Sequence, residues 1–233
     1  MSVHYSPKIV TNGLVCLLDA GNSKSYPGTG NVWYDLSGNN RHYTKNSGAT
    51  WNSSGYFSVN TNASSIGFTG PPSNSFGFTD IQHTIFSFID ITGNSGSTFC
   101  RWDASPNTGS DRRAISAHIP YGVDFYYDVA GCCGATQRIS ANNGTALLNY
   151  GIFCAILRTR TNTTPNREFF VNLTSTVNSS TNSTASVTWN DTTAAYIGSN
   201  WSGRIYNFLV YNRALTNEEL AQNYNTFKNR FGL

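Results

Sequence analysis

Apolar and polar side chains alternate over short stretches along most of this chain, and a period of two is typical of β-strands. Runs rich in Gly, Asn and Ser, which favour turns, separate these stretches. So many short strands need two sheets rather than one. Polar tracts at 60–77 and 174–186 are expected to form long surface loops. The pattern predicts strands at residues 13–19, 33–36, 56–59, 84–91, 98–102, 114–119, 123–129, 137–140, 152–158, 168–173 and 195–198.

The run 201–213 differs from the other strand candidates because apolar side chains occupy both of its alternating registers. Leu209 and Tyr211 lie on one side of an extended chain, and Phe208 and Val210 lie on the other. A strand of this kind is buried on both faces. We therefore expect it in the middle of the sheet pair.

A helix is predicted directly after this run. Thr216 can cap the free amides of the first turn, and Glu219, three residues on, can reach back to the amide of the cap. Leu220, Tyr224 and Phe227 then recur at helical spacing and form one apolar face. The sequence is therefore expected to end in a short docked helix.

Composition favours a single all-β domain. Aromatic residues make up 14% and charged residues only 12% of the 233 residues, well below the quarter that is usual for charged residues. A net charge of +3 is too small for a nucleic-acid partner, and no run of about twenty apolar residues could span a membrane. The first residues lack the apolar segment of a secretory signal, so we expect the chain to be completed in a cytoplasm.

The five cysteines form an odd set, and Cys132 and Cys133 are adjacent. Adjacent cysteines could form only a strained vicinal disulfide, and no spacing in the sequence supports a zinc site. We therefore predict free, mostly buried thiols.

Both ends of the chain carry motifs of a known family. Residues 9–28 (IVTNGLVCLLDAGNSKSYPG) and 33–39 (WYDLSGN) resemble the opening of concanavalin A-like, laminin-G-like jelly-roll domains. They look most like the domains in structural proteins of tailed bacteriophages of aquatic bacteria. Residues 201–205 (WSGRI) and 211–219 (YNRALTNEE) are similar to the end of the same domains, so the resemblance covers essentially the whole chain.

This resemblance implies an all-β fold, a two-sheet antiparallel concanavalin A-like jelly-roll sandwich with a short C-terminal helix. The domain would occupy residues 9–233, after an N-terminal arm of residues 1–8. Members of the family serve in glycan binding, protein binding, particle architecture and, in some branches, glycan hydrolysis. The fold alone does not decide among these functions.

Catalysis of glycan hydrolysis is not expected. Retaining glycosidases need two carboxylates about 5 Å apart, and the chain has three glutamates, Glu168, Glu218 and Glu219. The last two belong to the predicted helix start, where capping and the helix dipole explain them. Asp124 and Asp128 share one face of a strand but lie roughly 13 Å apart. We therefore predict a non-enzymatic protein without catalytic residues.

Candidate glycan-binding or partner-binding residues cluster between residues 100 and 127. Aromatic rings stack on sugar rings, and arginines bond hydroxyl groups in pairs. The candidates are Arg101, Trp102, Arg112, Arg113 and Tyr121, beside His118 and Asp124. The alternative is that Trp102 is a core aromatic and the two adjacent arginines belong to a solvated turn.

No cofactor is expected, although the family resemblance implies calcium as an option. The loop 35–40 (DLSGNN) offers oxygen ligands for Ca²⁺, and an Asx-turn explains the same residues as well. A dedicated calcium site usually gathers more carboxylates, so no metal ligands are assigned.

The resemblance favours a bacteriophage virion structural protein, either a capsid decoration protein or a fibre component, made in the host cytoplasm. Its partners would be other virion proteins, with a homo-oligomer and host cell-surface glycans as further options. His4, Tyr5 and Pro7 lie before the first strand and form a candidate subunit-docking arm. The alternatives are a carbohydrate-binding lectin-like module without an assembly role and a degenerate glycan hydrolase.

Overall fold

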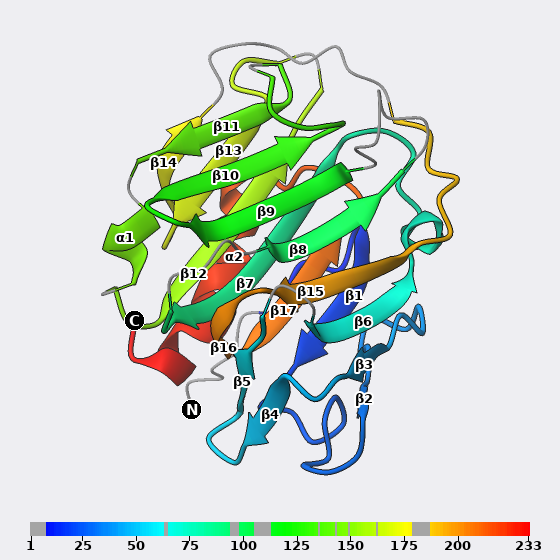
Figure 1. Cartoon of the computed structure of the whole chain (residues 1–233), viewed down its shortest axis with the longest axis vertical. Helices are drawn as coiled ribbons and strands as arrows, with labels where there is room; N and C mark the ends of the chain where they lie inside the picture. Colours follow the sequence, from blue (N-terminus) through cyan, green and yellow to red (C-terminus); the bar gives the residue numbers. More distant parts are fainter. Residues whose placement is uncertain are drawn as a thin grey trace, which may run out of the picture.

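Two antiparallel sheets stacked face to face, with a helix behind the rear sheet, form the architecture seen in Figure 1. The computed structural model describes residues 8–62, 65–93, 98–104, 113–134, 136–142, 144–148, 150–161, 163–178 and 187–233. Within that part of the chain, no helix is long and apolar enough to cross a membrane.

The rear sheet, sheet A, has nine strands among the described residues and runs in the order β14, β13, β12, β7, β16, β5, β4. Strand β17 continues β16, pairs with β7 and adds β1. The strands are β1 (Leu14–Asp19), β4 (Ala49–Asn52), β5 (Tyr56–Asn60), β7 (His83–Ile91), β12 (Phe153–Thr159), β13 (Arg167–Val171), β14 (Thr174–Asn178), β16 (Ser202–Ile205) and β17 (Asn207–Tyr211).

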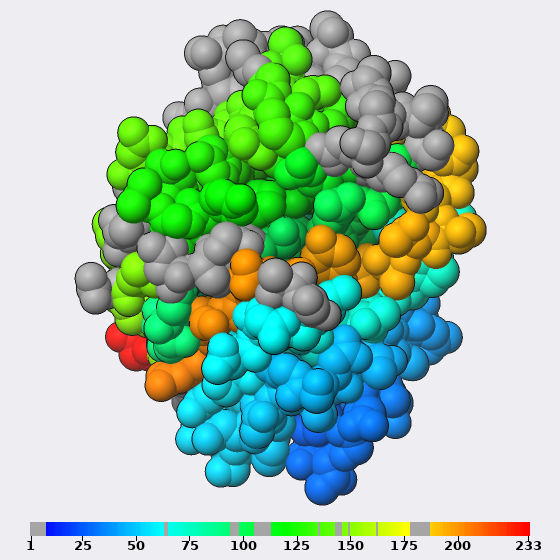
Figure 2. All heavy atoms as spheres, in the orientation of Figure 1, coloured from blue at the N-terminus to red at the C-terminus, as the bar shows by residue number. Residues whose placement is uncertain are grey.

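The front sheet, sheet B, has eight described strands in the order β11, β10, β9, β8, β15, β6, β3, β2. Its outer surface faces the reader in the space-filling view, with the green strands of residues 113–141 above the cyan and blue ones (Figure 2). The strands are β2 (Val32–Trp33), β3 (Tyr43–Lys45), β6 (Ile66–Pro72), β8 (Thr98–Asp103), β9 (Arg113–Tyr121), β10 (Asp124–Val129), β11 (Arg138–Ala141) and β15 (Ala194–Ser199).

Large aromatic side chains fill the space between the sheets. Trp33, Trp102 and Trp201 are fully buried there, together with Phe57 and Phe68. Each aromatic side chain buries 150–250 Å² of surface, so at about 25 cal/mol/Å² these rings supply much of the hydrophobic stabilisation. Trp201 also donates from its indole Nε1 to the carbonyl of Ile119 at 2.6 Å, which ties sheet A to sheet B.

Residues 205–211 of the apolar run are buried on both faces, as predicted, whereas the Arg204 side chain is 43% exposed. The run also forms two strands rather than one. The backbone of Tyr206 bonds to segments on both sides of it. Its amide donates to the carbonyl of Phe88 at 3.0 Å, and its carbonyl accepts from the amide of Ala20 at 2.9 Å. Asn207 Oδ1 then accepts a hydrogen bond from the amide of Phe88 at 2.7 Å. This break between β16 and β17 lets one run serve two pairings within sheet A.

The predicted helix is α2 (Asn217–Phe227), and its cap is confirmed. The amide of Glu219 donates to Thr216 Oγ1 at 3.3 Å, and Glu219 Oε2 accepts from the amide of Thr216 at 2.9 Å. Leu220 and Phe227 pack on the rear face of sheet A, in a second apolar cluster with Phe88. The chain continues into a 3₁₀ turn, η2 (Lys228–Phe231). Two short helices, α1 (Gly144–Leu147) and η1 (Ser73–Phe76), complete the described elements.

The prediction of a loop over 60–77 is wrong, because β6 occupies much of that tract, and β14 likewise occupies the start of the tract 174–186. Strand β6 lacks an alternating pattern because neighbouring side chains come close to its backbone at two glycines. A Cβ on Gly67 would lie 2.9 Å from Val59, and one on Gly70 would lie 2.6 Å from the ring of Tyr43. Glycine replaces the apolar residues that would mark a strand in the sequence.

The cysteine prediction is correct in part. Cys16, Cys100 and Cys154 are free and buried, and burial raises the pKa of all three thiols. The prediction of free thiols is wrong for the adjacent pair, because Cys132 and Cys133 are joined by a disulfide. They lie in the turn after β10, where the backbone has positive φ angles, 57° at Ala130 and 78° at Cys133.

Candidate functional site

Apart from Trp102, the predicted binding residues that the structure describes lie on or beside the outer face of sheet B. Arg113 and Tyr121 stand at the two ends of β9, and Arg101 lies on the neighbouring strand β8. Arg112 falls outside the described residues. The arm residues His4, Tyr5 and Pro7 also fall outside them, so the predicted arm is not placed.

Trp102 points the other way, into the core. Its side chain is fully buried, stacked on Phe208 with ring centroids 6.1 Å apart and edge-on to Phe76 at 5.4 Å. The indole therefore has no face open to a sugar ring, and the core alternative describes this residue. Arg101 is on the outer face, where its Nε donates to Asp103 Oδ1 at 2.6 Å.

The centre of the candidate site is a carboxylate, Asp128, whose side chain is fully buried at the end of β10. Arg138 donates to both of its oxygens, from Nε at 2.5 Å and from Nη2 at 2.7 Å. Arg113 Nη1 donates to Oδ2 at 3.2 Å, and His118 Nε2 lies 3.8 Å from the same oxygen. A buried carboxylate is stable only when paired, so Asp128 holds the two arginines in fixed positions. His118 Nε2 lies 3.3 Å from Ser116 Oγ.

Tyrosine rings form the rim of this network. Tyr121 is 47% exposed and lies edge-on to His118, with ring centroids 5.5 Å apart. The ring of Tyr126 lies 5.8 Å from that of Tyr121, and the guanidinium of Arg138 sits 4.3 Å above it. The hydroxyl of Tyr126 donates to Asp124 Oδ2 at 2.7 Å, and this hydrogen bond raises the pKa of Tyr126. The rings and cations line a hollow of about 240 Å³.

Three members of this site were missed from the sequence. Asp128 was considered only as half of a catalytic pair, and Tyr126 and Arg138 were not considered for binding. A usable signal existed, because Asp124, Tyr126 and Asp128 occupy alternate positions and so share the outer face of β10. The contact of Arg138 with Asp128 could not be found in this way, because it depends on the register in which β10 and β11 pair in the fold.

The other carboxylates considered for chemistry are held in structural bonds. Glu168 is 5% exposed and bonds to Arg158 at 2.8 Å and Arg160 at 2.9 Å. Asp35 accepts from the amides of Leu17 and Ser37, both at 2.8 Å, as an Asx-turn does. Among the described residues, no three His, Cys, Asp or Glu side chains are grouped so that they could hold a metal ion.

Solved structures with the same fold include enzymes and toxins. The chain matches Trypanosoma rangeli sialidase in complex with sialic acid with a TM-score of 0.62 and 13% identity, over 94% of this chain and 33% of the sialidase. It matches the binding domain of Paraclostridial Mosquitocidal Protein 1 with a TM-score of 0.61 and 13% identity, over 94% of this chain and 53% of that one. The binding domain of botulinum neurotoxin serotype D gives a TM-score of 0.59 and 13% identity, over 92% and 52%.

These likenesses confirm the predicted fold class, an all-β, two-sheet antiparallel sandwich of the concanavalin A-like type with one C-terminal helix. The chain spans about a third of the sialidase and about half of each toxin chain. No family model and no curated protein matches this sequence. The bacteriophage branch, the virion role and the virion location stay predictions.

Proposed function

We propose that this protein is a carbohydrate-binding domain and that it binds sugar on the outer face of sheet B. The observation that carries the proposal is the exposed ring of Tyr121 beside His118 and beside Arg113 and Arg138, the two arginines that Asp128 anchors. An aromatic face and planar polar groups in one hollow are what a sugar ring needs, since it is apolar on its faces and polar at its edge.

Preorganisation supports the proposal. The side chains of the hollow stand on strands of a sheet, and Asp128 fixes the guanidinium of Arg138 through two bonds. Little side-chain entropy is then lost when a ligand binds. The likeness to two domains that are described as binding domains, and to a sialidase that binds sialic acid, points in the same direction.

The proposed function is non-catalytic. A glycosidase of the common two-carboxylate type needs one carboxylate free to act as nucleophile or base and another that can carry a proton. Asp128 accepts from both Arg138 and Arg113, and Glu168 is bound between two arginines away from this face. Neither carboxylate is therefore placed to act as such an acid or nucleophile.

Binding to an array of immobilised glycans tests the proposal. Wild-type protein is expected to bind a defined set of glycans, and Tyr121→Ala is expected to weaken that binding about tenfold, the loss of roughly 1.4 kcal/mol of stacking. Tyr34→Ala is the matched control, because Tyr34 is a 41% exposed tyrosine on the β2 side of the molecule. Absence of any glycan ligand, or equal binding by wild type and Tyr121→Ala, would contradict the proposal.

A further inference from the structure

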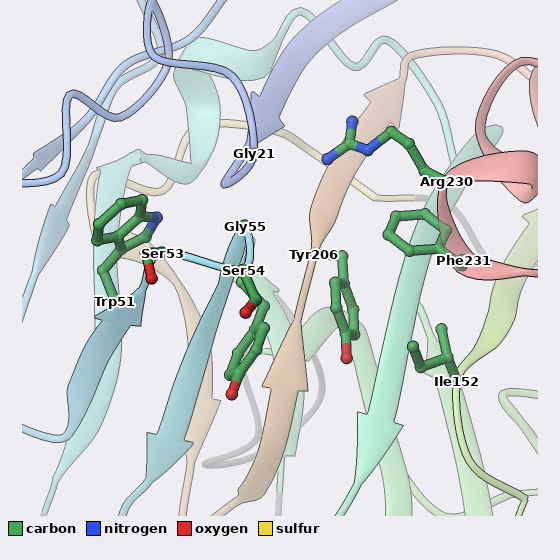
Figure 3. A pocket seen from close by; sticks show the side chains of 10 residues that line it. Gly21, Trp51, Ser53, Ser54, Gly55, Ile152, Tyr206, Arg230 and Phe231 are labelled. Atoms are coloured by element: carbon green, nitrogen blue, oxygen red, sulfur yellow. The ribbon is translucent and has the colours of Figure 1, made fainter.

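A cleft of about 470 Å³ lies on the opposite side of the sandwich, on the rear face of sheet A. Its walls are the turn between β4 and β5 on one side and η2 on the other, and Tyr206 lies between them (Figure 3). The turn between β4 and β5 meets the turn after β1 closely at this cleft. Gly55 has φ +82°, and a Cβ there would lie 3.0 Å from the Cα of Gly21.

Aromatic side chains follow the cleft from wall to wall. Figure 3 shows the indole of Trp51 at one end, Tyr206 in the middle and Phe231 at the other end. The ring centroid of Tyr56 lies 5.4 Å from that of Tyr206, which in turn lies 5.0 Å from Phe231. Trp51 is held in place because its Nε1 donates to the carbonyl of Ala20 at 2.9 Å. Trp51 is therefore fixed before any ligand arrives, and the other three rings pack against one another.

Polar groups stand above this aromatic row. Arg230 projects over the cleft, and its two Nη atoms donate to the carboxylate of Asp19 at 2.8 and 2.9 Å. Its side chain is 38% exposed, whereas that of Asp19 is 9% exposed. The hydroxyls of Ser53 and Ser54 lie at the other wall. The arginine and the two serines can thus form hydrogen bonds with a ligand, while the charge of Arg230 is already balanced by Asp19.

We propose that this cleft is a second carbohydrate site and that it takes a neutral saccharide. Trp51, Tyr56 and Phe231 are partly exposed along the cleft and suit successive sugar faces, while the buried Tyr206 packs between Tyr56 and Phe231. The serine and arginine groups suit hydroxyls. An acidic sugar would have to draw Arg230 from Asp19 and leave a nearly buried carboxylate without its partner, which is costly. The inference does not depend on the site at Asp128, since the two share no residue.

The test is calorimetric titration of the whole chain with a panel of neutral oligosaccharides, namely hexamers of β-1,4-glucose, β-1,4-N-acetylglucosamine, β-1,4-mannose and β-1,4-xylose. At least one is expected to bind, and Tyr56→Ala is expected to weaken it tenfold or more. Tyr56→Phe, which keeps the ring, should bind within about threefold of wild type, as should Tyr34→Ala.

Tryptophan fluorescence provides a second test that does not depend on whether Tyr56→Ala folds. The bound saccharide should change the tryptophan emission of the wild type, and Trp51→Phe should abolish that change. Trp33, Trp102 and Trp201 are fully buried, and Trp189, which packs on Phe78, does not line the cleft. The proposal is overturned if no hexamer binds at millimolar concentration. It is also overturned if hexagalacturonate binds more tightly than the neutral hexamers, or if binding falls with Tyr121→Ala and not with Tyr56→Ala.

Discussion

His83 is the first residue of β7, and its imidazole is completely buried between the sheets. Its Nδ1 lies 2.8 Å from the carbonyl of Ile81, so this nitrogen carries the proton. Its Nε2 then accepts from the hydroxyl of Tyr127, which in turn lies 2.6 Å from Thr159 Oγ1. Burial lowers the pKa of His83 to about 4, because a charged imidazolium has no solvation there.

This buried imidazole predicts a loss of stability in mild acid. Unfolded chains bind a proton at His83 below pH about 6.5 while the folded protein does not, so the free energy of unfolding should fall as the pH drops from about 6.5 towards 4. The full effect is about 3 kcal/mol. Urea unfolding at pH 7, 5.5 and 4.5 measures it, and His83→Gln should flatten the profile. Equal slopes for wild type and variant would refute this account.

At the scale of elements, the sequence predicted those whose signals are local. The cap of α2 depends on two residues three apart, and β7, β10 and β12 show long apolar or alternating runs. Strands β3 and β4 are short and half polar, and β6 has glycine at the positions where neighbouring side chains lie close to its backbone. None of the three therefore has the alternating apolar pattern that predicts a strand.

The binding face shows the same division. The sequence placed Arg113 and Tyr121 in one candidate region, because they are near each other in the chain. It could not place Arg138 on Asp128, since that contact depends on the register between β10 and β11. For Trp102 a local signal exists, because the charged residues Arg101 and Asp103 flank it while Cys100 and Ala104 share its register, a pattern typical of an inward-facing side chain.

Helix α2 provides a test at this scale. Thr216→Ala removes the side-chain acceptor of the first turn and is expected to lower the free energy of unfolding by about 1 kcal/mol. Asn225→Ala is the matched control, because Asn225 is exposed on the same helix and alanine suits a helix interior. Chemical denaturation should separate the two, and a Thr216→Ala protein as stable as the control would rule out a structural role for the cap.

At the scale of the whole molecule, one buried amide joins segments more than two hundred residues apart. Asn223 on α2 accepts from the amide of Val10 at 2.8 Å and donates to the hydroxyl of Tyr211 at 2.9 Å. That hydroxyl donates to the carbonyl of Val10, also at 2.9 Å. The entering segment, the helix and the central strand β17 are thus held by one small network behind sheet A.

Loss of this network should destabilise the protein as a whole. Asn223→Ala leaves the buried amide of Val10 without an acceptor, and we expect a cost of about 1–3 kcal/mol. Gln222→Ala removes an exposed bond from the same helix to the carbonyl of Lys8 and should cost much less. Thermal unfolding of the two variants compares them, and equal melting temperatures would contradict the role given to Asn223.

The sandwich has its two candidate ligand surfaces on opposite sides, one on sheet B and one behind sheet A. A single copy of the domain that holds one glycan on each side would connect two separate glycan-bearing objects without forming a dimer. Bridging of this kind multiplies weak contacts into strong adhesion. Particles or cells coated with both kinds of sugar would then clump in the presence of the monomer, and either free sugar would disperse them.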